Sequence, residues 1–306
     1  MKIHSWNEWD PLREIIVGTA ASANWPISDP VWINEKSHTT WSESDPPMGP
    51  VPDWVIEQTQ EDLESLCDIL RQAGVIVHRT ARIDYQKTDG FSGYCPRDRI
   101  LIAGDVIVDV AMMYPSRNQE IFGLEILMQH QFQHATMPWR QGLICDAANI
   151  CRLGDSWLFL ESRSGNRAAA AWLAARFSDI KIHLCNFYQG VHIDSTVVPL
   201  REGVVMLNAS RVAEHTVPEP LRGWDKIWIQ DCVAQDFYQY PYASKWIGMN
   251  CLSIDPHTVI VDAAQTEIIK TLEQRHFTVI PHTLRHSRTL GGGHHCVTLD
   301  LWRQHD

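Results

Sequence analysis

The sequence lacks any hydrophobic run long enough to cross a membrane. Its longest apolar stretch, Ala168 to Ala175, is closed off by Arg167 and Arg176, and it is far shorter than the ~20 residues that a membrane-spanning helix needs. The first ten residues turn polar too early to hold the apolar core of a secretory signal. We therefore expect a cytoplasmic protein without a membrane partner.

Positive charge is also scarce. The 306 residues include 26 Lys and Arg against 37 Asp and Glu, which gives a formal net charge of -11. The sequence has no dense run of Lys or Arg, so the phosphate backbone of a nucleic acid finds little to bind. Nucleic acid is therefore not expected as a partner.

Paired cysteine motifs are absent as well. None of the eight cysteines forms a C-x-x-C pair, which removes the strongest sequence signal for structural zinc or for a thioredoxin-like redox site. The cysteines are spread over the whole chain and are not concentrated as in a small disulfide-bonded domain. We expect free thiols, so any functional cysteine has to be identified individually.

What the sequence does contain is an alternation of short β-branched runs and helical patterns. Residues 15–17 and 75–77 predict strands, and a helix is predicted between them, beginning at Asp53 and ending just before Gly74. The helix prediction depends on four apolar residues at helical spacing, Leu63, Leu66, Leu70 and Ala73. Residues 20–52 show neither the period of a strand nor that of a helix, which predicts a long ordered loop.

The same alternation continues to the C-terminal part of the chain. Further strands are predicted at residues 100–102, 106–108, 157–159, 180–182, 204–206, 259–261 and 279–280, with helices at 119–128, 166–177 and 264–275. The repeated order of strand, strand, helix and strand indicates the α/β class. Nothing resembling a linker separates two halves, so we expect one compact domain over residues 1–306.

Two local clusters hold the strongest candidates for chemistry. In the first, Gly291, Gly292 and Gly293 precede His294, His295 and Cys296. Glycines let the backbone approach a ligand closely, although a tight turn beside a buried thiol explains the same pattern. In the second, strand-like alternation over residues 191–194 would place His192 and Asp194 on one face. A histidine alone is more often a satisfied core residue, but two ionisable residues on one face favour a site.

Three further residues have both a functional and a plain structural interpretation. Asp146 is either a functional carboxylate or a turn or helix cap, Asp98 either a site residue or half of a local ion pair, and Arg211 either a ligand or a solvated side chain. Together the clusters supply a cysteine, a histidine and carboxylates. This set can perform nucleophilic catalysis, because thiolate attack forms a covalent intermediate and an imidazole can protonate a leaving amine.

Six motifs, in order along the chain, resemble those of the arginine amidinotransferases. They are SWNEWDPL at 5–12 with IVG at 16–18, PRD at 96–98, DAA at 146–148, HID at 192–194, SKW at 244–246 with MN at 249–250, and LGGGHHC at 290–296 followed by Thr298 and Asp300. The family includes glycine amidinotransferase, the inosamine-phosphate enzymes and the amidinotransferases of cyanobacterial guanidine toxins. The resemblance implies a five-bladed α/β propeller of strand-strand-helix-strand units around a central active site.

The resemblance also implies a role for each candidate residue. It makes Cys296 the nucleophile, His192 the general acid and then base, Asp146 the carboxylate that orients His192, Asp98 and Asp194 the holders of the guanidinium, Arg211 the partner of the donor's α-carboxylate, and Ser244 a further substrate-binding residue. Carboxylates suit a guanidinium cation, whose carbon must be fixed facing the sulfur. The planar fork of an arginine suits a carboxylate.

The implied reaction transfers an amidino group in two steps and requires no metal or organic cofactor. Cys296 attacks the guanidinium carbon of L-arginine, L-ornithine leaves, and the amidino group then moves from the cysteine to an acceptor amine. The partners are therefore small molecules, and whether the chain forms a homodimer stays open. The chain departs from the family's usual residues at His294, Ala243, Asn149 and Pro115. These departures leave the acceptor amine unidentified.

Two alternatives stay open. On the same fold, water could replace the acceptor amine, which would make the protein an arginine-hydrolysing deiminase or dihydrolase. Alternatively, the 15 histidines and the run from His294 to Cys296 could bind zinc without catalysis. Adjacent histidines on a strand point to opposite faces, which weakens the zinc hypothesis.

Overall fold

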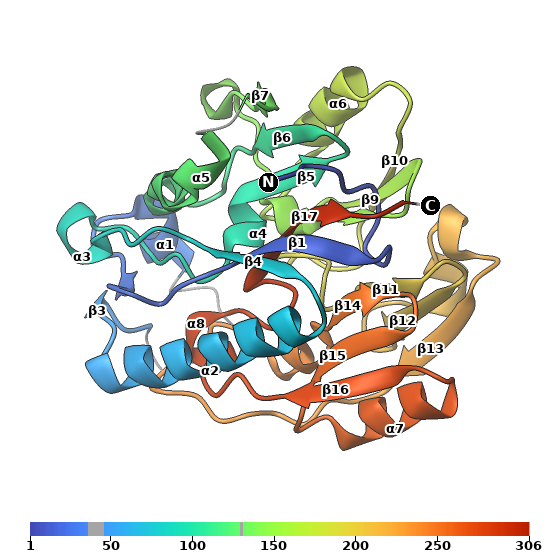
Figure 1. Ribbon diagram of the computed structural model, residues 1–306. Helices are drawn as coiled ribbons and strands as arrows, with labels where there is room; N and C mark the ends of the chain where they lie inside the picture. Colours follow the sequence, from blue (N-terminus) through green and yellow to red (C-terminus); the bar gives the residue numbers. More distant parts are fainter. Residues whose placement is uncertain (36–45, 129–130, 306) are drawn as a thin grey trace.

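The computed structural model describes residues 1–35, 46–128 and 131–305. Within these residues the strands form five three-stranded sheets and one two-stranded sheet, which pairs β2 (Asn24–Trp25) with β3 (Gly49–Pro50). Helices and strands alternate along the chain (Figure 1), which confirms the predicted α/β class. Every helix in the described residues is too short or too polar to span a membrane.

Both ends of the described chain build one sheet. Strand β1 (Leu12–Val17) pairs antiparallel with β17 (Thr298–Arg303) and parallel with β4 (Ile76–Arg79). In Figure 1 the red strand β17 lies directly beside the blue strand β1. The connection from β1 to β4 runs through helix α2 (Asp53–Gln72), as a parallel pair requires a crossover.

The other four sheets repeat this pattern, each with one antiparallel and one parallel pair. Their strands are β5 (Ile100–Ala103), β6 (Val106–Asp109) and β7 (Gln133–Thr136); β8 (Ile150–Arg152), β9 (Ser156–Leu160) and β10 (Lys181–Cys185); β11 (Val197–Arg201), β12 (Val204–Asn208) and β13 (Asp225–Ile229); and β14 (Leu252–Asp255), β15 (Thr258–Asp262) and β16 (Thr278–His282). The predicted order of strand, strand, helix and strand is confirmed for the sheets whose crossover contains α5 (Glu125–Met128), α6 (Arg167–Arg176) or α7 (Thr266–Gln274). Between β12 and β13 two 3-10 turns replace the helix.

The helices and turns that complete the chain are mostly short. They are α1 (Pro30–Glu35), α3 (Tyr85–Thr88), α4 (Pro96–Arg99), α5 (Glu125–Met128), α6 (Arg167–Arg176), α7 (Thr266–Gln274) and α8 (Ser287–Leu290), with 3-10 segments η1 (Pro115–Leu124), η2 (Trp139–Gln141), η3 (Ala147–Asn149), η4 (Glu214–Thr216), η5 (Glu219–Leu221) and η6 (Lys245–Met249). The longer helices α2, α6 and α7 lie at the periphery in Figure 1. The short helix α4 is buried along its whole length.

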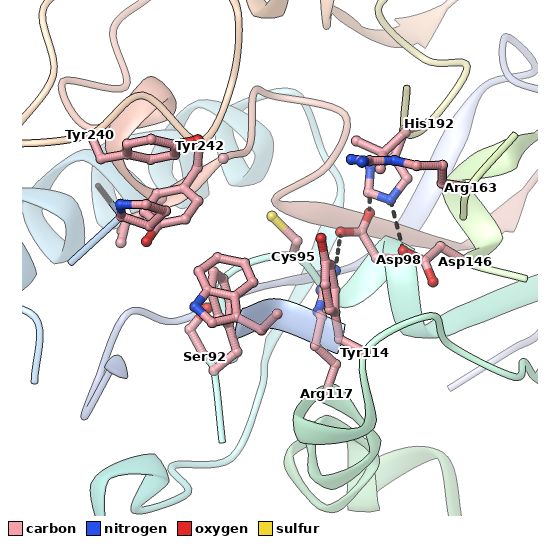
Figure 2. A pocket seen from close by; sticks show the side chains of 16 residues that line it. Ser92, Cys95, Asp98, Tyr114, Arg117, Asp146, Arg163, His192, Tyr240 and Tyr242 are labelled. Atoms are coloured by element: carbon pink, nitrogen blue, oxygen red, sulfur yellow. Dashed lines mark hydrogen bonds and ion pairs between the residues drawn. The ribbon is translucent and has the colours of Figure 1, made fainter. Parts of the chain in front are cut away.

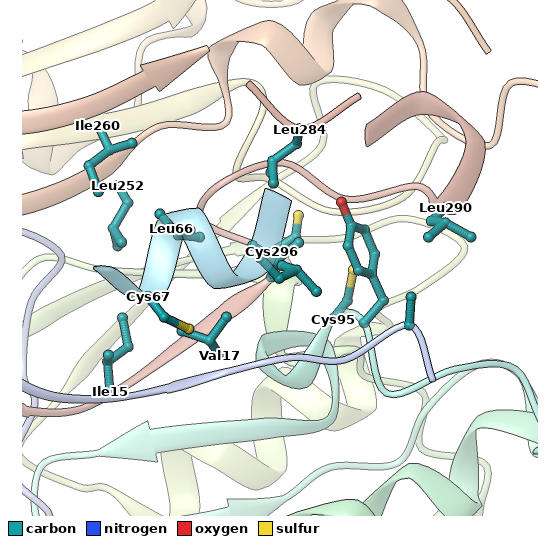
Figure 3. Packing of buried hydrophobic residues seen from close by; sticks show 14 of the residues in the cluster. Ile15, Val17, Leu66, Cys67, Cys95, Leu252, Ile260, Leu284, Leu290 and Cys296 are labelled. Carbon is teal, nitrogen blue, oxygen red and sulfur yellow. The ribbon is translucent and has the colours of Figure 1, made fainter. Parts of the chain in front are cut away.

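Helix α2 shows how an amphipathic pattern supports the site. Its buried face includes Leu63, Leu66 and Leu70, as the spacing predicts, and full burial of each such side chain is worth roughly 1.5–3 kcal/mol. The helix ends before Gly74, whose φ of +81° lies in the left-handed region that glycine adopts without strain. The same hydrophobic cluster contains Cys95 and Cys296 (Figure 3), so α2 packs against the core that includes the candidate nucleophile.

Two predictions about local structure are wrong in part. The loop predicted over residues 20–52 contains β2, helix α1 and β3. The helix begins there because the Asp29 carboxylate accepts the backbone N–H groups of Val31 and Trp32. Residues 36–45 of that loop lie outside the described residues. The helix predicted over 119–128 is the 3-10 segment η1 followed by the single α-turn α5, because Pro115 opens the segment ahead of the predicted start.

Candidate active site

An open cavity brings three of the candidate residues together. It measures about 910 Å³, including solvent at its mouth, and Asp98, Asp146 and His192 line it. Figure 2 shows these three side chains with Arg163 on one side of the cavity and Tyr240 and Tyr242 on the other. The cavity therefore combines a charged wall with an aromatic wall.

The charged wall is organised around His192. Its Nε2 lies 3.0 Å from Asp146 Oδ2, and its Nδ1 lies 3.9 Å from Asp98 Oδ1. The other oxygen of Asp146 accepts a hydrogen bond of 2.9 Å from the backbone N–H of Met113. Asp146 makes no capping hydrogen bond to the turn that follows it, and its Oδ2 contacts the imidazole instead.

The backbone at His192 is not the strand that the sequence predicts. Residues 191–194 lie in the loop between β10 and β11, and His192 has a φ of +59°, in the left-handed region that a residue with a side chain adopts less readily. The Tyr188 hydroxyl donates to the backbone carbonyl of His192. The predicted alternation over 191–194 is therefore wrong, and a strained turn orients His192 and Asp194.

Asp98 belongs to helix α4 and is 2% exposed. Its Oδ2 accepts a hydrogen bond of 2.9 Å from Arg117, whose guanidinium also binds Glu120 through two hydrogen bonds of 2.7 and 2.8 Å. Asp98 Oδ1 has no hydrogen-bond partner within the described part of the chain. A buried carboxylate oxygen without a partner is costly, and this one belongs to a residue that lines the cavity.

The plain structural interpretation of Asp98, half of a local ion pair, does not apply to its neighbour Arg97. Arg97 turns away from the cavity, donates to the backbone carbonyl of His295 at 2.7 Å and pairs with Asp300 at 2.6 Å. Asp98 is thus held by Arg117 from a distant segment, which leaves its second oxygen directed to His192.

Cys296 lies behind the wall of this cavity. It is 2% exposed, and its thiol donates a hydrogen bond of 3.2 Å to Asp194 Oδ2. Cys95, which lines the cavity, lies against it: a Cβ added to Gly292 would come within 2.5 Å of Cys95 Sγ and 3.3 Å of Cys296 Cβ. Only a glycine at position 292 leaves room for both cysteines.

The Cys296 turn is also tied to the His192 loop. Asn250 Oδ1 accepts the backbone N–H groups of His295 and Cys296, each at 3.0 Å, while Asn250 Nδ2 donates to the backbone carbonyl of Asp194 at 3.2 Å. One amide side chain therefore fixes the candidate nucleophile relative to Asp194.

The electrostatics of the site set the charge of each group. Burial lowers the pKa of His192, but Asp98 and the hydrogen bond to Asp146 outweigh burial and raise the pKa to about 9. Burial raises the pKa of Asp194, but the hydrogen bond and the charge of His295 outweigh it and lower the pKa to about 2. Burial raises the pKa of Asp98 above its ordinary value. A hydrogen bond with Cys95, together with burial, raises the pKa of the Cys296 thiol well above its ordinary value.

Three of the candidate substrate ligands do not line this cavity: Asp194 contacts Cys296 behind its wall, and Arg211 and Ser244 lie elsewhere. Arg211 stacks on the Tyr188 ring at 4.3 Å and donates to Thr196 at 2.8 Å, and Ser244 precedes the turn η6. Neither residue, although both are described, is among those that line the 910 Å³ cavity. Arg163 does line it, although none of the sequence motifs includes this residue.

The cysteines are free thiols, and the two adjacent histidines His294 and His295 do not share a partner. All eight cysteines are free, as predicted. His294 contacts His282, whereas His295 contacts Asp194, so the two adjacent histidines have separate partners. In the described ranges no three His, Cys, Asp or Glu side chains gather in a way that could hold a metal ion.

Comparison with known proteins adds an independent observation. The chain is 39% identical to inosamine-phosphate amidinotransferase 1 of Streptomyces glaucescens, in a match that covers 97% of this chain and 95% of that protein. The chain belongs to the amidinotransferase family. No family model matches it.

Other amidinotransferases extend the comparison. The solved structure of inosamine-phosphate amidinotransferase from Streptomyces griseus has a TM-score of 0.93 with this chain at 36% identity, and the match covers 99% of this chain and 97% of that one. The L-arginine:L-lysine amidinotransferase of Pseudomonas savastanoi pv. phaseolicola is 28% identical, over 98% of this chain and 94% of its own length. The expected family and the expected class of enzyme, a transferase, are therefore confirmed.

Proposed function

We propose that this amidinotransferase takes its amidino group from L-arginine, releases L-ornithine, and passes the group through Cys296 to an acceptor amine. The observation that carries the proposal is the buried Asp98 carboxylate, whose Oδ1 has only a long ion pair of 3.9 Å to His192 and no hydrogen-bond partner among the described residues at the cavity wall. A cationic guanidinium supplies the hydrogen bonds that this oxygen lacks. A relative that is named for L-arginine as donor supports the choice of guanidinium.

In the first half-reaction, Asp98 and Asp194 hold the guanidinium from two sides. Asp98 is the ligand in the cavity, and Asp194 contacts the Cys296 thiol at 3.2 Å. The thiol is protonated before the donor binds, because its pKa lies well above the ordinary value. A guanidinium beside the sulfur favours the thiolate, since a nearby positive charge lowers the pKa of a thiol, and the thiol proton passes to solvent through the open cavity. The bound donor thereby activates its own nucleophile at the wall formed by Cys95 and Gly291.

His192 then transfers the protons in both half-reactions. With a pKa of about 9 its imidazole is protonated at neutral pH, so it can give a proton to the departing nitrogen of ornithine. The neutral imidazole that remains accepts a proton from the acceptor amine as that amine attacks the amidino carbon. Asp146, at 3.0 Å, keeps the ring in place throughout.

The ligands of the donor's amino-acid end belong to the same proposal. Arg211 and Ser244 are the candidates that the family resemblance implies for substrate binding. Arg163, which lines the cavity, is a third candidate. We replace Arg211 or Arg163 by Gln and compare the half-saturating concentrations of L-arginine and of agmatine, its decarboxylated analogue. The variant that loses its preference for L-arginine identifies the arginine that binds the donor's carboxylate.

The finer description of the fold is also a proposal. We infer that residues 1–306 form a single domain in which the five three-stranded sheets are the blades of an α/β propeller around the site. The repeated sheet pattern and the closure of the first sheet by β17 support this arrangement.

The experiment that tests the function separates its two steps. Incubation of the enzyme with L-arginine should add the mass of one amidino group to wild type, and to Cys296→Ala none. A panel of amines added afterwards should remove the group and identify the acceptor by its product. Release of urea, or of citrulline and ammonia, in the absence of any amine would instead indicate hydrolysis, which the amidinotransferase relatives do not favour.

A further inference from the structure

We propose that His295 is a positioning residue that holds the Asp194 carboxylate in place for the donor guanidinium. This inference depends on the proposed function, because it gives Asp194 the role of guanidinium ligand. The His295 side chain contacts neither the reacting thiol nor the 910 Å³ cavity. We assign the positioning role to the contacts that it makes on the far side of Asp194.

The imidazole of His295 lies between two buried carboxylates. Its Nδ1 lies 2.9 Å from Asp194 Oδ2, and its Nε2 lies 3.3 Å from Glu8 Oε2. The three side chains are 12, 7 and 6% exposed for His295, Asp194 and Glu8. Both partners accept hydrogen bonds, so an imidazole that carries a proton on each nitrogen satisfies both contacts.

The far carboxylate is itself rigidly held. Arg152 donates hydrogen bonds of 2.9 and 2.8 Å to Glu8, one to each carboxylate oxygen. Arg152 also binds Asp300 at 2.8 Å, and Arg97 joins Asp300 to the backbone carbonyl of His295. Arg152 and the hydrogen bond from His295 hold the pKa of Glu8 well below its ordinary value despite burial, which alone raises it. Glu8 is therefore a fixed negative charge against which His295 is oriented.

Packing alone does not hold Asp194 in this position. A second, narrow cavity, of about 340 Å³ with open solvent included, borders Glu8, Asp194 and His295. Packing around Asp194 is therefore incomplete on this side, and the hydrogen bonds of its Oδ2 define the orientation of the carboxylate. That oxygen receives both the His295 contact and the Cys296 thiol. Without His295 the carboxylate can rotate away from the thiol and from the guanidinium.

The neighbouring histidine provides a matched comparison. His294 occupies the same turn and is 2% exposed, but its Nε2 lies 3.0 Å from His282 Nδ1 and it lines neither cavity. Substitution at His294 disturbs the same stretch of backbone without touching Asp194.

The test uses two replacements that each keep one of the two contacts. The amide nitrogen of an asparagine reaches the place of Nδ1, so His295→Asn keeps a donor for Asp194. The amide nitrogen of a glutamine reaches the place of Nε2, so His295→Gln keeps a donor for Glu8 instead. We measure the arginine concentration that half-saturates formation of the amidino-enzyme, the limiting rate, and the melting temperature of wild type, both variants and the control His294→Phe.

We expect the half-saturating arginine concentration to change more than the limiting rate. His295→Gln should raise the half-saturating arginine concentration about ten- to a hundredfold, the value of a lost hydrogen bond to a charged carboxylate. His295→Asn should raise it less than about tenfold, because a neutral donor is retained. The limiting rate should change less than the half-saturating concentration, and His294→Phe should stay within about twofold of wild type in both.

Each contrary result has its own meaning. If wild type forms no amidino-enzyme, the proposed function fails, and with it the basis of this inference. If wild type forms the adduct and His295→Gln half-saturates as wild type does, Asp194 needs no support and the inference is refuted while the function stands. Equal losses in both His295 variants, in proportion to a lower melting temperature, would also refute it by showing a purely structural role.

Discussion

Replacement of Asp146 by Asn tests whether the site sets the charge of His192. The rise of the His192 pKa from its ordinary 6.5 to about 9 corresponds to about 3.4 kcal/mol in favour of the imidazolium. Burial opposes this rise, so Asp98, Asp146 and Asp194 together contribute more than that value. Asp146→Asn removes the charge 3.0 Å from Nε2 and leaves Asp98 in place.

The magnitude follows from the value of the contact that is lost. A hydrogen bond to a charged group is worth about 1.5–3 kcal/mol, which equals about one to two pKa units. The pKa of His192 in Asp146→Asn should therefore fall to between about 7 and 8. The first half-reaction needs the imidazolium as acid, so its rate should decline near pH 9 in wild type and between pH 7 and 8 in the variant.

The assay is the rate of amidino-enzyme formation from saturating arginine, measured by intact mass between pH 6 and 10. Titration of the His192 ring protons by NMR checks the pKa directly. Asp105→Asn is the control, because Asp105 is exposed and pairs with His4. A decline that stays near pH 9 in Asp146→Asn would refute the assignment of Asp146 as the partner that charges His192.

Three further predictions concern binding, packing and stability. Asp98→Asn should raise the half-saturating arginine concentration about ten- to a hundredfold, and an unchanged value in the same mass assay would remove Asp98 from the site. Gly292→Ala should displace the two cysteines that its Cβ would meet and slow adduct formation, whereas Gly223→Ala, with open space around its Cβ, should not; equal rates would contradict the packing argument. Because the folded pKa of His192 is about 9 against 6.5 unfolded, its stabilising charge is fully present below pH 6.5 and is lost as pH rises through 9. The stability advantage of wild type over His192→Gln in denaturant unfolding should shrink over that range, and a constant difference would contradict it.

The sequence predicts those elements whose pattern is local. Helix α2 follows from apolar spacing and Gly74, and the strands with continuous apolar runs, such as β12, are found where they were expected. Strand β7 escapes prediction because three of its four residues, Gln133, His134 and Thr136, are exposed and give no apolar run. The strand predicted at His192 fails because the hydrophobic pattern carries no information on a positive φ.

The same limit of sequence-based prediction applies to the site, whose residues contact one another across long stretches of the sequence. The motifs identify Cys296, Asp194, Asp98, Asp146 and His192. The structure places Asp98, Asp146 and His192 together at one cavity and Cys296 with Asp194 behind its wall. The residues that hold them in position were missed or had no assigned role.

Those supporting contacts join segments far apart in the sequence. Arg117 reaches Asp98 across 19 positions, Asn250 reaches Cys296 across 46, and Glu8 reaches His295 across 287. No periodicity within a short window reports such contacts. The Arg117 and Glu120 pair, three residues apart, is the one signal that local spacing could have offered.

The central claim is that the amidino group rests on Cys296 between two half-reactions. The most direct measurement is intact-mass analysis after incubation with L-arginine alone, followed by peptide mapping of the adduct. The account predicts one added amidino group on the peptide that contains Cys296, loss of that group when the acceptor amine is supplied, and parallel double-reciprocal lines in steady state. Turnover without any adduct, with intersecting lines, would mean direct transfer in a ternary complex and would contradict the account.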